Sequence, residues 1–385
     1  MKRRISILGS TGSIGKQALQ VIALHPESFT VSALIANSSA EQLFAQAREF
    51  RPRVAGLSAD EVPIPDDLRD IEWVFGDAAL RAGAESAEAD DVLVSVVGVC
   101  GLPATLAALK SGKRVLLANK ETLVAGGALV EQVIKETGGS LLPVDSEHSA
   151  IFQCLNAAEG NPMSRIYLTA SGGPFRLWCK EDIDRATPAS ALRHPNWNMG
   201  AKVTIDSASM FNKALEVVEA RWLFSAKPSQ IHPLVHPQSV VHSMVEFEDG
   251  AVIAQLGVPD MRLPILYALS YPKRMATGAP RLDFSKYSAL IFEEPDYEKF
   301  PALSLAFETL EAGGAAAAEM NAADEIAVAA FLNEKLLFGD IYRVIRAVLD
   351  DLGALPLLDI DDLAEADARA RRSAETHIKR LGLRR

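Results

Sequence analysis

Short apolar runs alternate with helical patterns through the first 145 residues, and no other feature limits the fold of this chain so strongly. The runs typical of strands cover residues 5–8, 31–35, 92–97, 115–118 and 141–144. Strands of this length, separated by helical patterns, are typical of a doubly wound α/β fold with a mostly parallel sheet. The sequence therefore predicts an N-terminal Rossmann-like, dinucleotide-binding domain over residues 1–145.

The pattern changes after residue 145. Residues 146–275 mix strand patterns at 165–170, 240–247 and 251–256 with one helix at 209–224, which predicts an α+β catalytic and dimerisation domain. Within it, residues 171–200 are rich in Gly, Pro and Trp and are expected to form a mobile lid loop, because long loops are usually functional or disordered. Residues 276–300 are expected to be a linker. Periodicity at 322–336 and 341–352 predicts a C-terminal helical bundle over residues 301–385.

Composition argues against several classes of protein. The chain has 385 residues and a net charge of −11, so it lacks the basic surface with which proteins neutralise nucleic-acid phosphates. The uncharged residues 92–109 are interrupted by Gly98, Gly101 and Pro103, which predicts a buried strand turning into a helix and no membrane span. Three cysteines without a CxxC pair, and an N-terminus without a signal-peptide pattern, predict a cytoplasmic location.

A glycine-rich turn follows the first strand. Residues 9–15, GSTGSIG, place three glycines at a strand-to-helix junction, where backbone N–H groups can hold a pyrophosphate. After the second strand, Asn37, Ser38 and Ser39 include no acidic residue to bind an adenosine 2′-hydroxyl, which favours NADP over NAD. No Lys or Arg stands there either, so Asn37 and its neighbours offer only neutral donors to a 2′-phosphate.

Three carboxylates stand where a metal ion could bind. Asp145 and Glu147 follow the last strand of the N-terminal domain, at the sheet edge where open α/β folds bind ligands. In the predicted catalytic-domain helix, Asn212 and Glu216 are one turn apart and share a face, with Lys213 beside them. Carboxylate oxygens suit a hard cation such as Mg²⁺ or Mn²⁺. Taken alone, Asp145 and Glu147 would equally fit a solvated helix start.

Neutral and positive donors suited to a phosphate gather downstream. They are Ser171, His194, Ser207, Asn212 and Lys213. Trp197 lies in the predicted lid and is expected to close over a bound substrate. Lys120 follows a strand of the parallel sheet, which makes it either a catalytic group or a solvated surface charge.

The chain resembles the 1-deoxy-D-xylulose 5-phosphate reductoisomerases of the non-mevalonate isoprenoid pathway. The resemblance spans nearly the whole chain, in the ordered segments GSTGSIG, LLANKETLV, PVDSEHSA, TASGGPF, HPNWNMGAKVTIDSASMFNKALEVVEA, HPQSVVHSMVEF and MNAADEIAVAAF. It implies a homodimeric enzyme that uses NADPH and a divalent metal, Mg²⁺, Mn²⁺ or Co²⁺. The implied reaction converts 1-deoxy-D-xylulose 5-phosphate to 2-C-methyl-D-erythritol 4-phosphate.

The resemblance also implies roles for individual residues. The implied metal ligands are Asp145, Glu147 and Glu216. The implied substrate contacts are Lys120, Ser146, Glu147, Ser171, His194, Ser207, Asn212, Lys213 and Glu216, to which the lid residue Trp197 is added. The expected cofactor contacts are Thr11, Gly12, Ser13, Ile14, Asn37, Asn119, Glu121 and Gly200. The expected catalytic residues are Lys120, Glu147 and His194, with Glu147 or Lys120 handling the proton.

One departure and two alternatives follow from the same residues. Many relatives carry Gly-Lys-Asn where this chain has Asn37-Ser38-Ser39, which implies a weaker contact with the 2′-phosphate. A metal-independent NAD(P) dehydrogenase of another sugar phosphate would use the glycine turn but leave the carboxylates unexplained. A dinucleotide-sensing module without catalysis would bind its cofactor whether or not Mg²⁺ or Mn²⁺ is present. The expected partners are a small sugar phosphate and a second copy of the chain, without nucleic acid or membrane.

Overall fold

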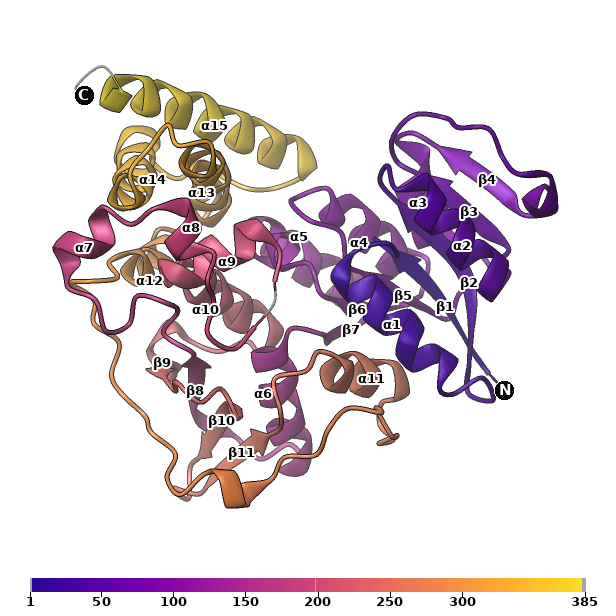
Figure 1. The fold of residues 1–385 in the computed structure, drawn as a ribbon, viewed down its shortest axis with the longest axis horizontal. Coiled ribbons are helices and arrows are strands. Elements are labelled where there is room, and N and C mark those ends of the chain that lie inside the picture. Colours follow the sequence, from indigo (N-terminus) through magenta and orange to yellow (C-terminus); the bar gives the residue numbers. More distant parts are fainter. Residues whose placement is uncertain (1, 198, 383–385) are drawn as a thin grey trace. The chain divides into compact units, whose positions relative to one another are not determined.

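Figure 1 shows the helices and strands of the chain, which a computed structural model describes over residues 2–197 and 199–382. The chain divides into two units. The first consists of Met1–Thr122, Leu129–Ser149 and Asp260–Pro280, and the second of Leu123–Ala128, Ala150–Pro259 and Arg281–Arg385. The domain borders predicted at residues 145, 275 and 300 stay a prediction.

A parallel sheet of seven strands forms the centre of the first unit. Its order is β4-β3-β2-β1-β5-β6-β7, and every neighbouring pair is parallel. The strands are β1 Arg3–Leu8, β2 Phe29–Ala36, β3 Val54–Leu57, β4 Glu72–Phe75, β5 Asp91–Val94, β6 Arg114–Leu117 and β7 Ser140–Pro143. The order reverses between β1 and β5, which is the arrangement of a doubly wound sheet and confirms the predicted Rossmann-like fold.

Helices connect these strands and bury their side chains. They are α1 Ser13–Ala23, α2 Ala40–Phe50, α3 Ala78–Glu85, α4 Gly101–Lys110 and α5 Lys120–Thr137. Helix α11 Arg262–Ser270 belongs to the same unit, whereas α6 Ser146–Ala157 follows β7 and belongs to the second unit from Ala150 onward. Ile5 and Ile7 on β1 and Leu93 on β5 are fully buried. Burial of such unbroken apolar runs is expected of a parallel sheet covered on both faces.

Two strands and one boundary differ from the sequence-based prediction. Strands β3 and β4 were not predicted, because each has four residues and Gly56 interrupts the apolar run of β3. A Cβ on Gly56 would lie 2.6 Å from the Val74 carbonyl oxygen, so the glycine lets the two strands approach. The strand predicted at 92–97 ends at Val94.

The uncharged stretch at residues 92–109 does not form one continuous element. Strand β5 takes its beginning, and α4 takes its end. Over the part of the chain that the structure describes, no helix has the length and apolar character needed to cross a bilayer.

The second unit contains a four-stranded sheet with the order β11-β10-β8-β9. The strands are β8 Met163–Ala170, β9 Ile231–Val235, β10 Val241–Phe247 and β11 Val252–Leu256. β8 pairs with β9 in parallel, whereas β10 is antiparallel to both of its neighbours. The predicted strands at 165–170, 240–247 and 251–256 are confirmed to within two residues at each end.

The predicted lid and the helix after it contain more elements than expected. Two short helices, α7 Lys180–Asp184 and α8 Pro188–Ala191, interrupt the stretch 171–200. A separate helix, α9 Ala201–Ala208, precedes α10 Phe211–Leu223, which is the helix predicted at 209–224. Met210 ends the first and begins the second in a left-handed conformation, with φ +62°.

Four helices complete the second unit and appear in orange to yellow in Figure 1. They are α12 Ala302–Ala312, α13 Ala316–Leu332, α14 Phe338–Leu352 and α15 Ile360–Gly382. Helix α13 packs against both α14 and α15. Buried alanines on α13 and α15, such as Ala323 and Ala370, allow close approach of the two helices. The predicted C-terminal helical bundle is therefore confirmed.

Candidate functional site

The glycine turn leaves the N-terminus of α1 open. Gly9 has φ +89°, and a Cβ there would lie 2.6 Å from the Ser95 carbonyl oxygen, at the point where the strand order reverses. Gly12 is the N-cap of α1 and makes no side-chain cap hydrogen bond. Gly12 and Ser13 are exposed, and Thr11 and Ile14 partly so. The Gly12 N–H donates to the Gly9 carbonyl oxygen at 3.0 Å, and the helix N-terminus beside it can receive a pyrophosphate. Contacts of the cofactor with these four residues stay a prediction.

The end of β2 carries the groups expected near the adenosine ribose. Asn37, Ser38 and Ser39 are all exposed. The Asn37 side-chain oxygen accepts a hydrogen bond of 3.2 Å from the Ser58 hydroxyl, and its backbone carbonyl accepts one of 3.1 Å from the Ala59 N–H. The next two residues, at positions 60–61, are Asp and Glu. A 2′-phosphate here would meet hydroxyl and amide donors beside an acidic loop.

Asn119 and Glu121 shape the loop that follows β5. The Asn119 amide nitrogen donates to Glu121 Oε2 at 2.7 Å and to the carbonyl oxygens of Val96 and Gly98 at 3.0 Å each. Its oxygen accepts from the Thr122 N–H at 3.1 Å and so caps α5. Asn119 is almost fully buried. In this arrangement the Asn119 side chain holds the 96–98 loop at the edge of the sheet where the carboxyl ends of the strands lie.

Lys120 and Asp145 follow the adjacent strands β6 and β7 and form an ion pair. Their side chains are only 13% and 15% exposed. Lys120 is therefore a largely buried ion-pair partner and not a solvated surface charge, and its catalytic role stays a prediction. Its ammonium group is held where open α/β folds bind their ligands.

The segment from Asp145 to Glu147 begins α6. The Glu147 N–H donates to Asp145 Oδ1 at 3.2 Å, so Asp145 does cap the helix. The Ser146 hydroxyl donates to Glu147 Oε2. One carboxylate oxygen of Asp145 and one of Glu147 also lie within 4.8 Å of each other. The same two residues can therefore cap the helix and also ligate one cation.

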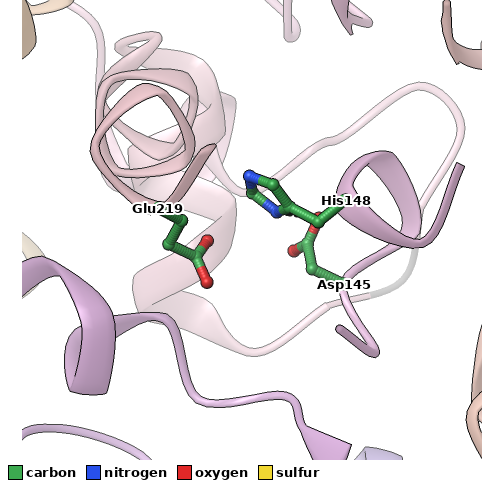
Figure 2. Close-up of side chains that lie close together, drawn as sticks. All are labelled: Asp145, His148 and Glu219. Atoms are coloured by element: carbon green, nitrogen blue, oxygen red, sulfur yellow. Dashed lines mark ion pairs between the residues drawn. The ribbon is translucent and has the colours of Figure 1, made fainter. Parts of the chain in front are cut away.

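His148 was not predicted as a site residue. Figure 2 shows its imidazole beside the Asp145 carboxylate, with Nδ1 3.4 Å from Asp145 Oδ1, and the ring is fully buried. Figure 2 also draws Glu219, which is a buried residue of α10 in the second unit. The spacing of three residues between Asp145 and His148 on a helix is a signal that could have identified the histidine.

Ser171 and His194 are in contact in the second unit. Ser171 follows β8, and its Oγ lies 3.0 Å from His194 Nε2 and accepts from the Gly173 N–H at 3.1 Å. Gly173 has φ +65°, and a Cβ on it would lie 2.6 Å from the Ser207 carbonyl oxygen. The Ser171 turn therefore packs against the backbone at the end of α9 that carries Ser207.

The start of α10 carries a buried polar cluster. Asn212 donates to Glu216 Oε1 at 2.6 Å, so the two residues share one face of the helix, as their spacing of four residues predicted. Lys213 pairs with Glu216 Oε2, and the two side chains are only 3% and 1% exposed. The attraction between the two charges has to offset the cost of removing both of them from water.

Trp197 and Gly200 lie on the predicted lid and at its end. The centroids of the Trp197 and His242 rings are 6.1 Å apart. Gly200 is exposed and forms the N-cap of α9, where its carbonyl oxygen accepts from the Thr204 hydroxyl at 2.9 Å. An added Cβ on Gly200 would meet no described heavy atom within 4 Å, so a ligand can approach its backbone.

The predicted metal ligands are Asp145 and Glu147 in the first unit and Glu216 in the second. All three donate carboxylate oxygens, which fits a hard divalent cation and not the nitrogen and sulfur ligands that zinc prefers. Asp145 and Glu216 each pair with a lysine in this structure. The donor set therefore fits the proposed Mg²⁺ or Mn²⁺.

Family models cover most of the chain. Residues 5–127 match the model "1-deoxy-D-xylulose 5-phosphate reductoisomerase". Residues 141–224 match the C-terminal domain model of the same enzyme, and residues 256–373 match "DXP reductoisomerase C-terminal domain".

Relatives found by sequence and by structure carry the same enzyme name as these family models. The chain is 50% identical to the 1-deoxy-D-xylulose 5-phosphate reductoisomerase of Bacteroides fragilis over 381 aligned residues. The alignment covers 98% of each protein. It is 43% identical to the Zymomonas mobilis enzyme solved with NADPH, with a TM-score of 0.91 over 98% of this chain and 99% of that one. A further reductoisomerase structure, in complex with NADPH, fosmidomycin and magnesium, is 40% identical with a TM-score of 0.92 over 98% and 99%.

Proposed function

The chain belongs to the 1-deoxy-D-xylulose 5-phosphate reductoisomerase family, and on that premise we propose that it rearranges and reduces 1-deoxy-D-xylulose 5-phosphate. The product is 2-C-methyl-D-erythritol 4-phosphate, and the reaction requires NADPH and a divalent metal. The observation that carries the proposal is the Asp145 and Glu147 carboxylate pair, within 4.8 Å, at the ligand-binding edge of the parallel sheet.

Asp145, Glu147 and Glu216 hold the metal in this proposal. A divalent cation bound there supplies positive charge to substrate oxygens as negative charge develops on them. Once their carboxylate partners ligate a cation, Lys120 and Lys213 are available to anionic groups of the substrate. The two ion pairs therefore hold the carboxylates and the ammonium groups in place before substrate binds.

The second unit supplies the phosphate contacts. Ser171, Ser207, Asn212 and Lys213 offer hydroxyl, amide and ammonium donors, and a charged donor strengthens a hydrogen bond to phosphate. Binding energy gained at the phosphate, away from the reacting carbon atoms, can be used to close the lid. Trp197 then excludes water from the reacting carbonyl.

The first unit supplies the cofactor contacts and the proton. When bound, NADPH supplies the hydride, and the open N-terminus of α1 with Thr11, Gly12, Ser13 and Ile14 holds its pyrophosphate. Lys120 or Glu147 handles the proton, because both lie at the carboxyl edge of the sheet beside the proposed metal. His194 contributes through its contact with Ser171.

We also propose that the enzyme works as a homodimer in the cytoplasm. Support for the dimer comes from the family alone. The three cysteines, all within the described residues, form no disulfide with one another, which fits a reducing compartment.

Replacing Ser38 by lysine is expected to strengthen binding of NADPH selectively. Ser38 is exposed at the end of β2, where an added ammonium group would face the 2′-phosphate beside an acidic loop. We expect the KM for NADPH to fall about tenfold and that for NADH to change little, because only NADPH carries the 2′-phosphate. Steady-state kinetics with both cofactors would measure this ratio. Ser111→Lys, at an exposed position that ends α4 on the opposite edge of the sheet, is the control. An equal change for NADH would contradict the placement of the 2′-phosphate.

Product analysis tests the proposed function. The purified protein would be incubated with 1-deoxy-D-xylulose 5-phosphate, NADPH and Mg²⁺, and the product identified by NMR. We expect the branched 2-C-methyl-D-erythritol 4-phosphate, with one NADPH oxidised for each molecule formed. An unbranched alcohol would instead support a simple sugar-phosphate dehydrogenase, and cofactor binding without turnover would support a sensor.

A further inference from the structure

Asn196 connects the predicted lid to the turn between β9 and β10. Its side-chain Nδ2 donates to the Pro237 carbonyl oxygen at 2.8 Å and to Ser239 Oγ at 2.9 Å. All three residues belong to the second unit. The amide therefore uses both of its N–H groups to fix the 194–197 segment to a separate part of the chain.

The turn that receives Asn196 is itself firmly held. Ser239 is 8% exposed and has φ +50°, a left-handed conformation that a residue other than glycine adopts only when its surroundings impose it. The fully buried His236 begins the turn, stacks on Phe292 with ring centroids 4.7 Å apart, and makes a hydrogen bond of 2.8 Å with the Ile291 carbonyl oxygen. Asn196 is thus anchored to a rigid support.

This anchor determines the hydrogen bonding of His194. The backbone N–H groups of Asn196 and Trp197 both donate to His194 Nδ1, at 3.2 Å and 2.9 Å. An Nδ1 that accepts two N–H groups carries no proton, so in the neutral ring the proton is on Nε2. His194 Nε2–H therefore donates to Ser171 Oγ, 3.0 Å away.

The orientation of the Ser171 hydroxyl follows from this arrangement. Ser171 Oγ accepts from the His194 Nε2–H and from the Gly173 N–H, at 3.0 Å and 3.1 Å. A hydroxyl oxygen has two acceptor lone pairs, and both are then engaged. The remaining function of Ser171 is to donate its own hydrogen, which is what a phosphate oxygen requires.

We propose that Asn196 is a positioning residue for the phosphate of the substrate, acting through His194 and Ser171. By fixing the 194–197 segment to Pro237 and Ser239, it keeps His194 in the Nε2–H tautomer and directs the Ser171 hydroxyl toward the phosphate. The inference rests on the proposed function for the identity of the phosphate-bearing ligand. The tautomer of His194 does not depend on that identity.

Asn196→Asp is the most direct variant, because it keeps the size of the side chain and replaces the Nδ2 donor by an oxygen that faces the Pro237 carbonyl oxygen and Ser239 Oγ. Asn161→Asp is a matched control: Asn161 Nδ2 also donates to a carbonyl oxygen, that of Ala158 at 2.8 Å, in an exposed turn. We expect Asn196→Asp to raise the KM for 1-deoxy-D-xylulose 5-phosphate about tenfold to a hundredfold. We expect kcat to fall less and the KM for NADPH to stay unchanged, since the loss is in binding of the phosphate.

Ser239→Gly tests the support separately. Glycine adopts the left-handed φ without strain, so the variant should remain folded while it loses the Oγ acceptor. We expect a smaller rise in KM than for Asn196→Asp, because the hydrogen bond to Pro237 remains. Thermal unfolding of all variants gives the control for folding.

NMR of protein labelled with ¹⁵N-histidine gives a measurement independent of turnover. The His194 signals, assigned by their loss in His194→Gln, should show protonated Nε2 and unprotonated Nδ1 in the wild type and a mixture of tautomers in Asn196→Asp. Protonated Nδ1 in the wild type would overturn the inference. A substrate KM in Asn196→Asp equal to that of Asn161→Asp would also overturn it. Absence of turnover in the wild type would refute only the proposed function, and the NMR result would still decide the inference.

Discussion

Replacing Glu216 by glutamine is expected to lower kcat/KM for 1-deoxy-D-xylulose 5-phosphate by about a thousandfold or more, because it removes one of three anionic ligands of the proposed metal. The substitution keeps the size of the side chain, and a glutamine can retain a hydrogen bond with Asn212. The buried Lys213 ammonium nevertheless loses its carboxylate partner, so thermal unfolding of the variant is measured beside its kinetics. Steady-state kinetics over a range of Mn²⁺ concentrations would measure it, and we expect the metal concentration at half-maximal activity to rise.

A matched control distinguishes loss of a ligand from loss of a buried carboxylate. Glu319 on α13 is as buried as Glu216, with 1% of its surface exposed, and burial raises the pKa of its carboxyl group. Glu319→Gln should leave kcat/KM and the metal dependence close to those of the wild type. Near-normal turnover of Glu216→Gln, with an unchanged metal dependence, would remove Glu216 from the site.

Replacing Lys213 by methionine is expected to affect both catalysis and stability. Lys213 pairs with Glu216 in an environment where only 3% and 1% of the two side chains are exposed. Its loss removes the cationic partner of a buried carboxylate, which typically lowers the free energy of unfolding by about 3 kcal/mol. It also removes a charged contact to the substrate phosphate, so we expect kcat/KM to fall about a hundredfold. Urea unfolding and steady-state kinetics would measure the two effects separately.

The double variant Lys213→Met/Glu216→Gln separates the two consequences. Without the carboxylate there is no unpaired buried charge, so the double variant should unfold at a higher urea concentration than Lys213→Met alone. Activity should not return, because both the metal ligand and the phosphate contact are missing. Restored activity, or equal stability of the single and double variants, would contradict the role assigned to this pair.

Much of the fold could be predicted from sequence because its strands are strongly patterned. The apolar runs of β1, β2 and β5 are buried on both faces and therefore read as continuous hydrophobic segments. The four-residue strands β3 and β4 gave no such signal, because Gly56 and Glu72 weaken their patterns. No sequence pattern predicted the break between α9 and α10, because Met210 adopts a left-handed conformation that residues with a side chain rarely adopt.

The candidate site could be predicted only in part. Asp145, Glu147 and Glu216 stand in patterns that indicate their chemistry, and the spacing of Asn212 and Glu216 predicted their shared helix face but not their hydrogen bond. The pairing of Lys120 with Asp145 joins residues that follow two different strands and depends on the order of the sheet. Likewise, the contacts of Asn196 with Pro237 and Ser239 join segments about forty residues apart, for which local sequence carries no signal.

Binding of Mn²⁺, measured by electron paramagnetic resonance, would test most directly that Asp145, Glu147 and Glu216 hold one divalent metal. The samples would be the wild type, Asp145→Asn, Glu147→Gln and Glu216→Gln, with Glu319→Gln as control, each in the presence of NADPH. We expect a single Mn²⁺ bound per chain in the wild type and in the control, and affinity weaker by about tenfold or more in each of the three ligand variants. Binding of wild-type strength in any of those three would contradict the proposed metal site.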